Sequence, residues 1–207
     1  MFNTEELYEK VGDLLLRRRG HRITRALLDK MMGRPGPIAL QVMIDMHELE
    51  ATVEQLQQET AELFPAILDA ELAPMDGLLE LLDALEQWEI PKGVCTSSRR
   101  PFAEKALSKF ELTPRFDFVL TSDDVRRGKP APDIYAAAAS RWEVDPEEMM
   151  VLEDSQVGCE AAVSAGAFAI AVPGPHNANH QYPGAMHIAE SLADPHIYSA
   201  LQHGRAN

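Results

Sequence analysis

The sequence predicts an α/β protein, with a helical N-terminal segment followed by a core built on a parallel sheet. Three observations support this fold class. Residues 1–73 place their apolar side chains at helical spacing only. After Pro74, short apolar runs alternate with amphipathic segments. The short runs are apolar on both faces, which is typical of strands covered by helices on each side. We therefore expect a helical domain over 1–73 and an α/β core domain over 74–207.

Capping patterns and breakers divide the first segment into helices. Asn3 and Glu6 have the pattern of a reciprocal helix cap, and Thr52 with Gln55 repeats it. Glycine and proline after Met32 end a helix. The predicted helices begin near Asn3, run over Thr24–Met32 and Ile38–His47, and continue from Thr52 past Phe64, where Pro65 can introduce a kink.

The core segment alternates predicted strands and helices. The predicted strands are Lys92–Thr96, Asp117–Ser122, Met149–Glu153, Phe168–Val172 and Met186–Ile188. The predicted helices are Gly77–Trp88, Pro101–Phe110, Pro132–Trp142, one that ends at Gly166, and one at the C-terminus. Residues 173–184, rich in Pro, Gly, His and Asn, are predicted to form a loop.

Composition argues against several classes of function. The net charge of -14 disfavours nucleic acid or an anionic membrane as the main partner, but leaves room for a small anionic substrate. Cys95 and Cys159 lie far apart in apolar contexts, which indicates buried thiols in a reducing compartment. No window is apolar enough to span a bilayer, and the N-terminus does not resemble a secretory signal. We expect a cytoplasmic monomer that binds neither nucleic acid nor membrane.

Polar residues follow three of the predicted strands. A hydroxyl run begins at Thr96, Lys129 comes shortly after the second strand, and Glu153 and Asp154 end the third. Parallel α/β sheets bind ligands outside the carboxyl ends of their strands. Hydroxyls, free amides and a lysine suit a phosphate, and paired carboxylates suit Mg²⁺. Each motif alone also fits a helix cap or a solvated loop, but their order favours a Mg²⁺-bridged phosphoryl site.

The motifs TSSR, GKPAPDIY and VLEDSQVGCEAAVSAG, in that order, resemble the haloacid dehalogenase superfamily. More narrowly, they are similar to the branch that holds β-phosphoglucomutase and the small phosphoglycolate-type phosphatases. The resemblance extends over nearly the whole chain. The resemblance implies a Rossmann-like core with a helical cap domain, and it implies Mg²⁺ as the catalytic cofactor.

The resemblance also implies roles for individual residues. Thr96 matches the family's phosphate-binding hydroxyl, and Ser97 would add its backbone amide. Lys129 matches the lysine that steadies the nucleophile and the phosphate. Asp154 matches the Mg²⁺ ligand, with Glu153 beside it as a ligand directly or through water.

Further residues match positions that read the substrate. Ser98 and Arg99 occupy positions that face the far end of the substrate in the mutase-like branch. The MMGRP turn matches the substrate-reading turn of the cap, so Arg34 is expected to contact the part of the substrate that is not transferred; a plain surface arginine is an equal alternative.

The family's first motif, DxDG, is absent from this sequence. Its first Asp is the nucleophile that forms an aspartyl-phosphate, and it ends the first core strand. The opening MFNTEELY resembles the segment that follows this motif. We therefore expect the first core strand to be missing from this chain, and the nucleophile to lie upstream of Met1.

The expected function is a Mg²⁺-dependent phosphatase for a small phosphorylated metabolite, such as a sugar phosphate or phosphoglycolate. One alternative is a β-phosphoglucomutase-type phosphotransferase, although Tyr8 stands where the mutases have a histidine. Another is a form without nucleophile that is inactive or only binds ligand. Dehalogenation fits the acidic and phosphate-binding residues less well.

Overall fold

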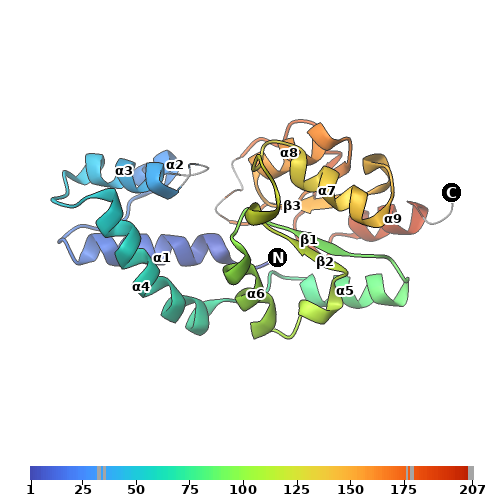
Figure 1. Cartoon of the computed structure of the whole chain (residues 1–207), viewed down its shortest axis with the longest axis horizontal. Helices are drawn as coiled ribbons and strands as arrows, with labels where there is room; N and C mark the ends of the chain where they lie inside the picture. The colour runs from blue at the N-terminus through green and yellow to red at the C-terminus, as the bar shows by residue number, and fades with distance from the viewer. Residues whose placement is uncertain (32–33, 35, 176, 178–179, 205–207) are drawn as a thin grey trace. The chain divides into compact units, whose positions relative to one another are not determined.

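The computed structural model describes residues 1–31, 34, 36–175, 177 and 180–204. The chain divides into two compact units (Figure 1). Phe2–Ala73 forms the first, which contains helices and, among the described residues, no strand, and Met1 together with Pro74–Asn207 forms the second, which contains the described strands. Within the described ranges, no helix combines the length and the apolar character that crossing a membrane requires.

The helical unit is held together by a core of long aliphatic side chains. Its helices are α1 (Thr4–Arg17), α2 (Arg25–Met31), α3 (Gly36–His47) and α4 (Val53–Glu71). Each helix contributes at least one fully or almost fully buried apolar residue, although α1 and α3 also carry exposed apolar side chains. These residues include Leu7, Leu15, Leu27, Met43, Leu56 and Leu68.

The two predicted capping patterns have different outcomes. The Thr52 hydroxyl accepts the Gln55 N–H at 3.2 Å, and the Gln55 side chain accepts the Thr52 N–H at 2.9 Å, which confirms the second cap. Asn3 precedes α1 but its side chain does not cap it. Its amide oxygen instead accepts the N–H of Ala73, which lies shortly after the end of α4, at 2.8 Å. Helix α4 continues through Pro65.

The α/β unit contains the predicted alternation of helices and strands. Its helices are α5 (Leu78–Gln87), α6 (Arg100–Lys109), α7 (Asp133–Trp142), α8 (Gln156–Ala165) and α9 (Pro195–Gly204). Its strands are β1 (Gly93–Cys95), β2 (Phe118–Leu120), β3 (Met150–Glu153), β4 (Phe168–Ala171) and β5 (His187–Ile188). Short 3₁₀ turns, η1 (Thr113–Arg115), η2 (Ser122–Asp124) and η3 (Pro146–Glu148), lie between them and were not predicted.

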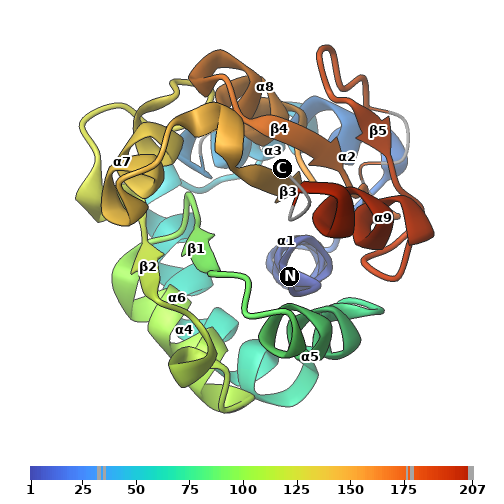
Figure 2. The same cartoon turned by 90° about the vertical axis from the view of Figure 1, so that its right-hand side faces the viewer.

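All described strand pairs are parallel, as predicted, but they form two separate sheets. Strand β1 pairs with β2, and β3 pairs with β4, which pairs with β5. In Figure 2, β1 and β3 are the members of the two sheets that face each other. Each therefore has one edge without a strand partner among the described residues. In a doubly wound α/β fold, an unpaired edge at the centre of the sheet leaves backbone donors and acceptors available to a further strand.

Helices α7 and α8 join the two sheets through a shared apolar core. Ile134, Tyr135 and Ala138 of α7 pack with Ala161 and Ala162 of α8 in one buried cluster. The cluster also includes residues of β2, β3 and β4. Small residues along α8 allow the helix to lie close to the sheet. This packing fixes the ends of β1 and β3 relative to each other.

Candidate active site

The carboxyl end of β1 continues into a tight turn of hydroxyl residues. The Thr96 N–H donates to the Leu120 carbonyl at 2.9 Å, which links the ends of β1 and β2. Thr96 Oγ1 accepts the Ser98 N–H at 3.1 Å. The Thr96 hydroxyl can still donate its own proton to an acceptor. Ser97 is exposed, and its N–H has no acceptor within the described part of the chain. The turn thus offers a hydroxyl and an amide as donors at the strand end.

Lys129 bridges the carboxyl ends of β1 and β3. Its Nζ donates to the Cys95 carbonyl at 3.1 Å and forms an ion pair with Glu153 Oε1. The two side chains of this ion pair are only 6% and 8% exposed. The Tyr135 ring, with its centroid 4.9 Å from Nζ, adds a cation–π contact. An ammonium has three N–H donors, so one remains for an anion after these two hydrogen bonds.

The Glu153 carboxylate is fully engaged with its neighbours. Its Oε1 accepts the Tyr135 hydroxyl at 2.5 Å in addition to Lys129, and its Oε2 accepts the Ser155 hydroxyl at 3.1 Å. Burial by itself would raise the Glu153 pKa, but the charge of Lys129 and these hydrogen bonds outweigh burial and lower it. Glu153 is therefore ionised at neutral pH and holds Lys129 in place.

Helix α8 approaches the Glu153 carboxylate so closely that only glycine fits at position 158. A Cβ atom there would lie well inside 3.0 Å of both carboxylate oxygens. The Gly158 N–H is itself capped by the Ser155 hydroxyl at 3.1 Å. The glycine in the EDSxxG pattern therefore has a steric cause.

Asp154 follows Glu153 but has different surroundings. Its backbone carbonyl accepts hydrogen bonds from Asn177 Nδ2 at 3.1 Å and the Tyr182 hydroxyl at 2.9 Å, which anchor the strand end to the following loop. Burial, together with the nearby charge of Glu153, raises the Asp154 pKa. The Met1 amino group lies nearby. Burial lowers the pKa of this amino group, and the negative charge of Asp154 partly offsets that effect.

The donor set at Asp154 fits a bound cation. Asp154 is half-buried, and among the described residues no side chain donates a hydrogen bond to its carboxylate. A carboxylate that is partly withdrawn from water is commonly paired with a positive charge or coordinates a metal. Oxygen donors at a strand end suit a hard divalent cation. Because both Glu153 oxygens are already engaged, its expected role as a metal ligand stays a prediction.

Ser98 and Arg99 lie beside the strand end, but their main interactions are with the neighbouring turn. The Ser98 carbonyl accepts the Ser122 N–H at 3.1 Å. The Arg99 side chain is 82% exposed, and its Nε lies 3.3 Å from Asp123 Oδ1. Asp123 also accepts a hydrogen bond from the Arg100 N–H. This bond is the main cause that lowers the Asp123 pKa, and Arg99 lowers it further. Their predicted contact with a substrate stays a prediction.

Arg34 belongs to the helical unit. Its side chain is exposed, and its Nε donates to the Lys30 carbonyl at 2.6 Å. The MMGRP turn was predicted to read the substrate, and its residues 32, 33 and 35 lie outside the described residues.

Sequence reasoning did not assign roles to Tyr135, Gly158 and Tyr182. Tyr135 is the last residue of the KPAPDIY motif, and Gly158 lies within the EDSxxG motif, so both were visible as parts of a pattern. Tyr182 falls in a segment predicted only as a loop, without any signal that its hydroxyl binds the Asp154 carbonyl.

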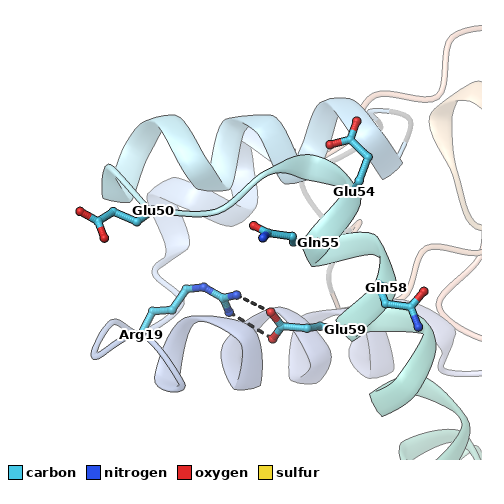
Figure 3. Close-up of a pocket in the computed structure, with 6 residues that line it drawn as sticks. All are labelled: Arg19, Glu50, Glu54, Gln55, Gln58 and Glu59. Carbon is cyan, nitrogen blue, oxygen red and sulfur yellow. Dashed lines mark hydrogen bonds and ion pairs between the residues drawn. The ribbon is translucent and has the colours of Figure 1, made fainter.

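A surface hollow in the helical unit is lined by charged and amide side chains (Figure 3). Within it, Arg19 donates two hydrogen bonds to the Glu59 carboxylate, which lower the Glu59 pKa. The lining residues are Arg19, Glu50, Glu54, Gln55, Gln58 and Glu59. None of the strand-end residues is among them. The hollow has an excess of negative charge, which disfavours a phosphorylated ligand.

Comparisons with known proteins agree with this architecture. Residues 1–172 match the model of the haloacid dehalogenase-like hydrolases. The chain is 35% identical to validoxylamine A 7'-phosphate phosphatase of Streptomyces hygroscopicus subsp. limoneus, over 86% of this chain and 83% of that protein. It is 30% identical to a phosphorylated carbohydrates phosphatase of Thermotoga maritima, over 80% of this chain and 77% of that protein.

A solved structure gives the same result at the level of the fold. CbbY of Rhodobacter sphaeroides, in complex with phosphate, superposes with a TM-score of 0.77 at 25% identity, covering 93% of this chain and 90% of that one. The family match over most of the chain and the 35% identical relative together establish the family. The chain belongs to the haloacid dehalogenase-like hydrolases.

Proposed function

We propose that this protein is a Mg²⁺-dependent phosphatase of a small phosphorylated metabolite. The observation that carries the proposal is the buried bridge made by Lys129 between the ends of β1 and β3. The bridge brings the hydroxyl turn after β1 and the acidic end of β3 to one lysine. A phosphate with two negative charges needs such a convergence of donors and positive charge. Two relatives are named as phosphatases, and the structure of CbbY contains bound phosphate. Both observations support a phosphatase function.

Each strand-end residue has a separate role in binding the phosphoryl group. The Thr96 hydroxyl and the Ser97 N–H donate to its oxygens, as free donors at a chain turn commonly do for anions. Lys129 donates its remaining N–H and offsets the negative charge that accumulates during transfer. Glu153 and Tyr135 act through Lys129, because they hold its ammonium in position. They are positioning residues.

Asp154 would hold the metal ion. Members of this family are generally metal-dependent, and a hard cation with oxygen ligands is the natural partner for this half-buried carboxylate. When bound, Mg²⁺ supplies charge neutralisation for the phosphoryl oxygens. Asn177 and Tyr182 fix the Asp154 backbone, and so keep its side chain at the end of β3.

The attacking group is proposed to be an aspartate on a strand that lies between β1 and β3. The family resemblance supplies the nucleophile, which forms an aspartyl-phosphate that water then hydrolyses. The separation of the two sheets supports a place for that strand, because β1 and β3 each lack a partner on the facing edge. We place this aspartate upstream of Met1.

The helical unit is proposed to act as a cap that selects the substrate and excludes water. Arg34 is the candidate for reading the part of the substrate that is not transferred, with Ser98 and Arg99 on the core side. One relative is named as a phosphatase of phosphorylated carbohydrates, which supports a sugar phosphate as the substrate class. A phosphoglycolate-sized substrate is the smaller alternative.

The test is phosphate release from a panel of sugar phosphates and phosphoglycolate. The assay uses the natural chain, with any residues that its gene encodes before Met1, and compares Lys129→Ala and Asp154→Ala with the exposed control variants Lys109→Ala and Asp76→Ala. We expect the site variants to lose about 100- to 1000-fold in kcat, and the controls to match wild type. Transfer of the phosphate within a hexose phosphate, without its release, would favour the mutase. Full turnover in both site variants would overturn the assignment of the site.

A further inference from the structure

A second group of potential metal ligands lies at the far edge of the three-stranded sheet. His187 begins β5, Asp194 lies directly before α9, and His196 is the second residue of α9. Figure 2 shows β5 and α9 next to each other at this edge. Backbone hydrogen bonds from Met186 to Ala169 and from Ala189 to Ala171, both 2.8 Å, hold β5 in place. The three side chains therefore come from two firmly positioned elements.

Their ligand atoms lie close enough together to converge on a small metal ion. His187 Nε2 lies 3.3 Å from Asp194 Oδ2, and His196 Nδ1 lies 3.1 Å from Asp194 Oδ1. One ligand atom from each residue lies within 4.8 Å of the others. In a tetrahedral zinc site with bonds of about 2.0–2.1 Å, neighbouring ligand atoms are about 3.3 Å apart. The two imidazole nitrogens face different Asp194 oxygens, so an ion between them would take either both oxygens of the carboxylate or one oxygen after the side chains adjust from a starting spread of up to 4.8 Å.

Backbone N–H groups fix the orientation of the Asp194 carboxylate. Asp194 Oδ1 accepts the His196 N–H at 2.8 Å, and Oδ2 accepts the Glu190 N–H at 3.3 Å. Hydrogen bonds to a metal-ligating carboxylate fix its orientation and are a regular feature of metal sites. The two imidazole rings lie against each other, with centroids 4.2 Å apart.

The two histidine side chains are partly exposed to solvent, so a metal ion bound by this cluster could also bind a water molecule or another ligand. The Asp194 side chain is 10% exposed, whereas the His187 and His196 side chains are 31% and 73% exposed. Three protein ligands with one open position are typical of a zinc ion that is accessible to solvent. The net charge of -14 also favours the approach of a cation.

We propose that His187, Asp194 and His196 form a binding site for a divalent transition-metal ion of the zinc class. Imidazole nitrogen ligands favour Zn²⁺, Co²⁺ or Ni²⁺ over Mg²⁺, which prefers oxygen. Each neutral imidazole binds the ion through its unprotonated nitrogen and keeps its proton on the other one. Strand β4 separates β5 from β3, a lateral distance of about 9–10 Å, so this site is distinct from Asp154.

The experiment is a calorimetric titration of ZnCl₂ into metal-free protein, repeated with CoCl₂ while the visible absorption of bound Co²⁺ is followed. All titrations use the Asp154→Asn background, which removes the other proposed metal ligand. We expect one equivalent to bind, and His187→Gln and His196→Gln each to weaken binding by about tenfold or more. His203→Gln, on the same helix but outside the cluster, is the matched control and should bind like its parent.

Asp194→Asn provides a further variant, because asparagine preserves the cap of α9 while it removes the ligand charge. It should weaken Zn²⁺ binding and leave circular dichroism unchanged. Binding of equal affinity in the double variant His187→Gln/His196→Gln would overturn the proposal. So would the absence of a Zn²⁺-dependent heat or Co²⁺ absorption in the folded parent, which would leave the imidazoles as simple hydrogen-bond partners of Asp194.

Discussion

Replacing Gly158 by alanine is expected to destabilise the α/β unit, although alanine is the better helix former. Gly158 lies in the first turn of α8, over the buried carboxylate of Glu153. The new Cβ would lie well inside 3.0 Å of both carboxylate oxygens, so Glu153 must move. Glu153 cannot move freely, because Lys129, Tyr135 and Ser155 all bind it.

The expected magnitude follows from two opposing effects. Alanine in place of glycine inside a helix stabilises by about 1 kcal/mol. Separating one partner of a buried ion pair costs about 3–5 kcal/mol, because a charge is left without its partner. The Lys129–Glu153 pair is only 6% and 8% exposed, so the second effect applies with little screening by solvent. We expect the free energy of unfolding to fall by about 2–4 kcal/mol.

Urea unfolding followed by tryptophan fluorescence measures this change, since Trp88 and Trp142 both lie in the α/β unit. Gly204→Ala is the control, because no atom lies within 4 Å of its added Cβ, and it should change stability by less than about 1 kcal/mol. In a Glu153→Ala background, Gly158→Ala should no longer destabilise. An equal loss in both backgrounds, or no loss in either, would refute the steric argument.

Three further predictions concern neighbouring groups. Tyr135→Phe leaves the Glu153 carboxylate without one buried donor, so urea unfolding should show a loss of about 1–3 kcal/mol. Burial raises the pKa of both Cys95 and Cys159 to about 12. At pH 8, only about one thiol in ten thousand is then a thiolate, which is the form that reacts with iodoacetamide. Mass spectrometry should therefore find no iodoacetamide adduct until urea unfolds the protein. Partial burial and the charge of Glu153 raise the Asp154 pKa, so its ionised carboxylate opposes folding at neutral pH. In EDTA, the melting temperature of Asp154→Asn should therefore match or exceed that of wild type, whereas saturating MgCl₂ should raise the melting temperature of wild type alone.

The backbone of the α/β unit could be predicted from periodicity. Met149–Glu153 has the short apolar pattern of a buried strand, and the structure forms β3 over Met150–Glu153. The carboxyl ends of parallel strands lie at one edge, so Thr96, Lys129 and Asp154 were expected together before any coordinates. In the structure, Lys129 contacts Cys95, the residue before Thr96, and Glu153, the residue before Asp154, while the shared site itself stays a prediction.

Side-chain partners could not be predicted in the same way. The pairing of Lys129 with Glu153, and the exclusion of a side chain at Gly158, depend on how closely α8 approaches β3. The donor that binds the Asn3 side-chain oxygen is the Ala73 N–H, which is far away in the sequence, and local capping rules do not include it. Periodicity reports which face of an element is buried, whereas the choice among polar partners depends on distances of a few tenths of an ångström.

The most direct test of a shared phosphate and metal site is a crystal structure of this protein with orthophosphate and Mn²⁺ in place of Mg²⁺, located by its anomalous signal. We expect the anion to lie within hydrogen-bond distance of Thr96 Oγ1, the Ser97 N–H and Lys129 Nζ, and the metal ion to bind the Asp154 carboxylate. Phosphate and Mn²⁺ bound at other positions, with these groups in contact with neither, would contradict this expectation.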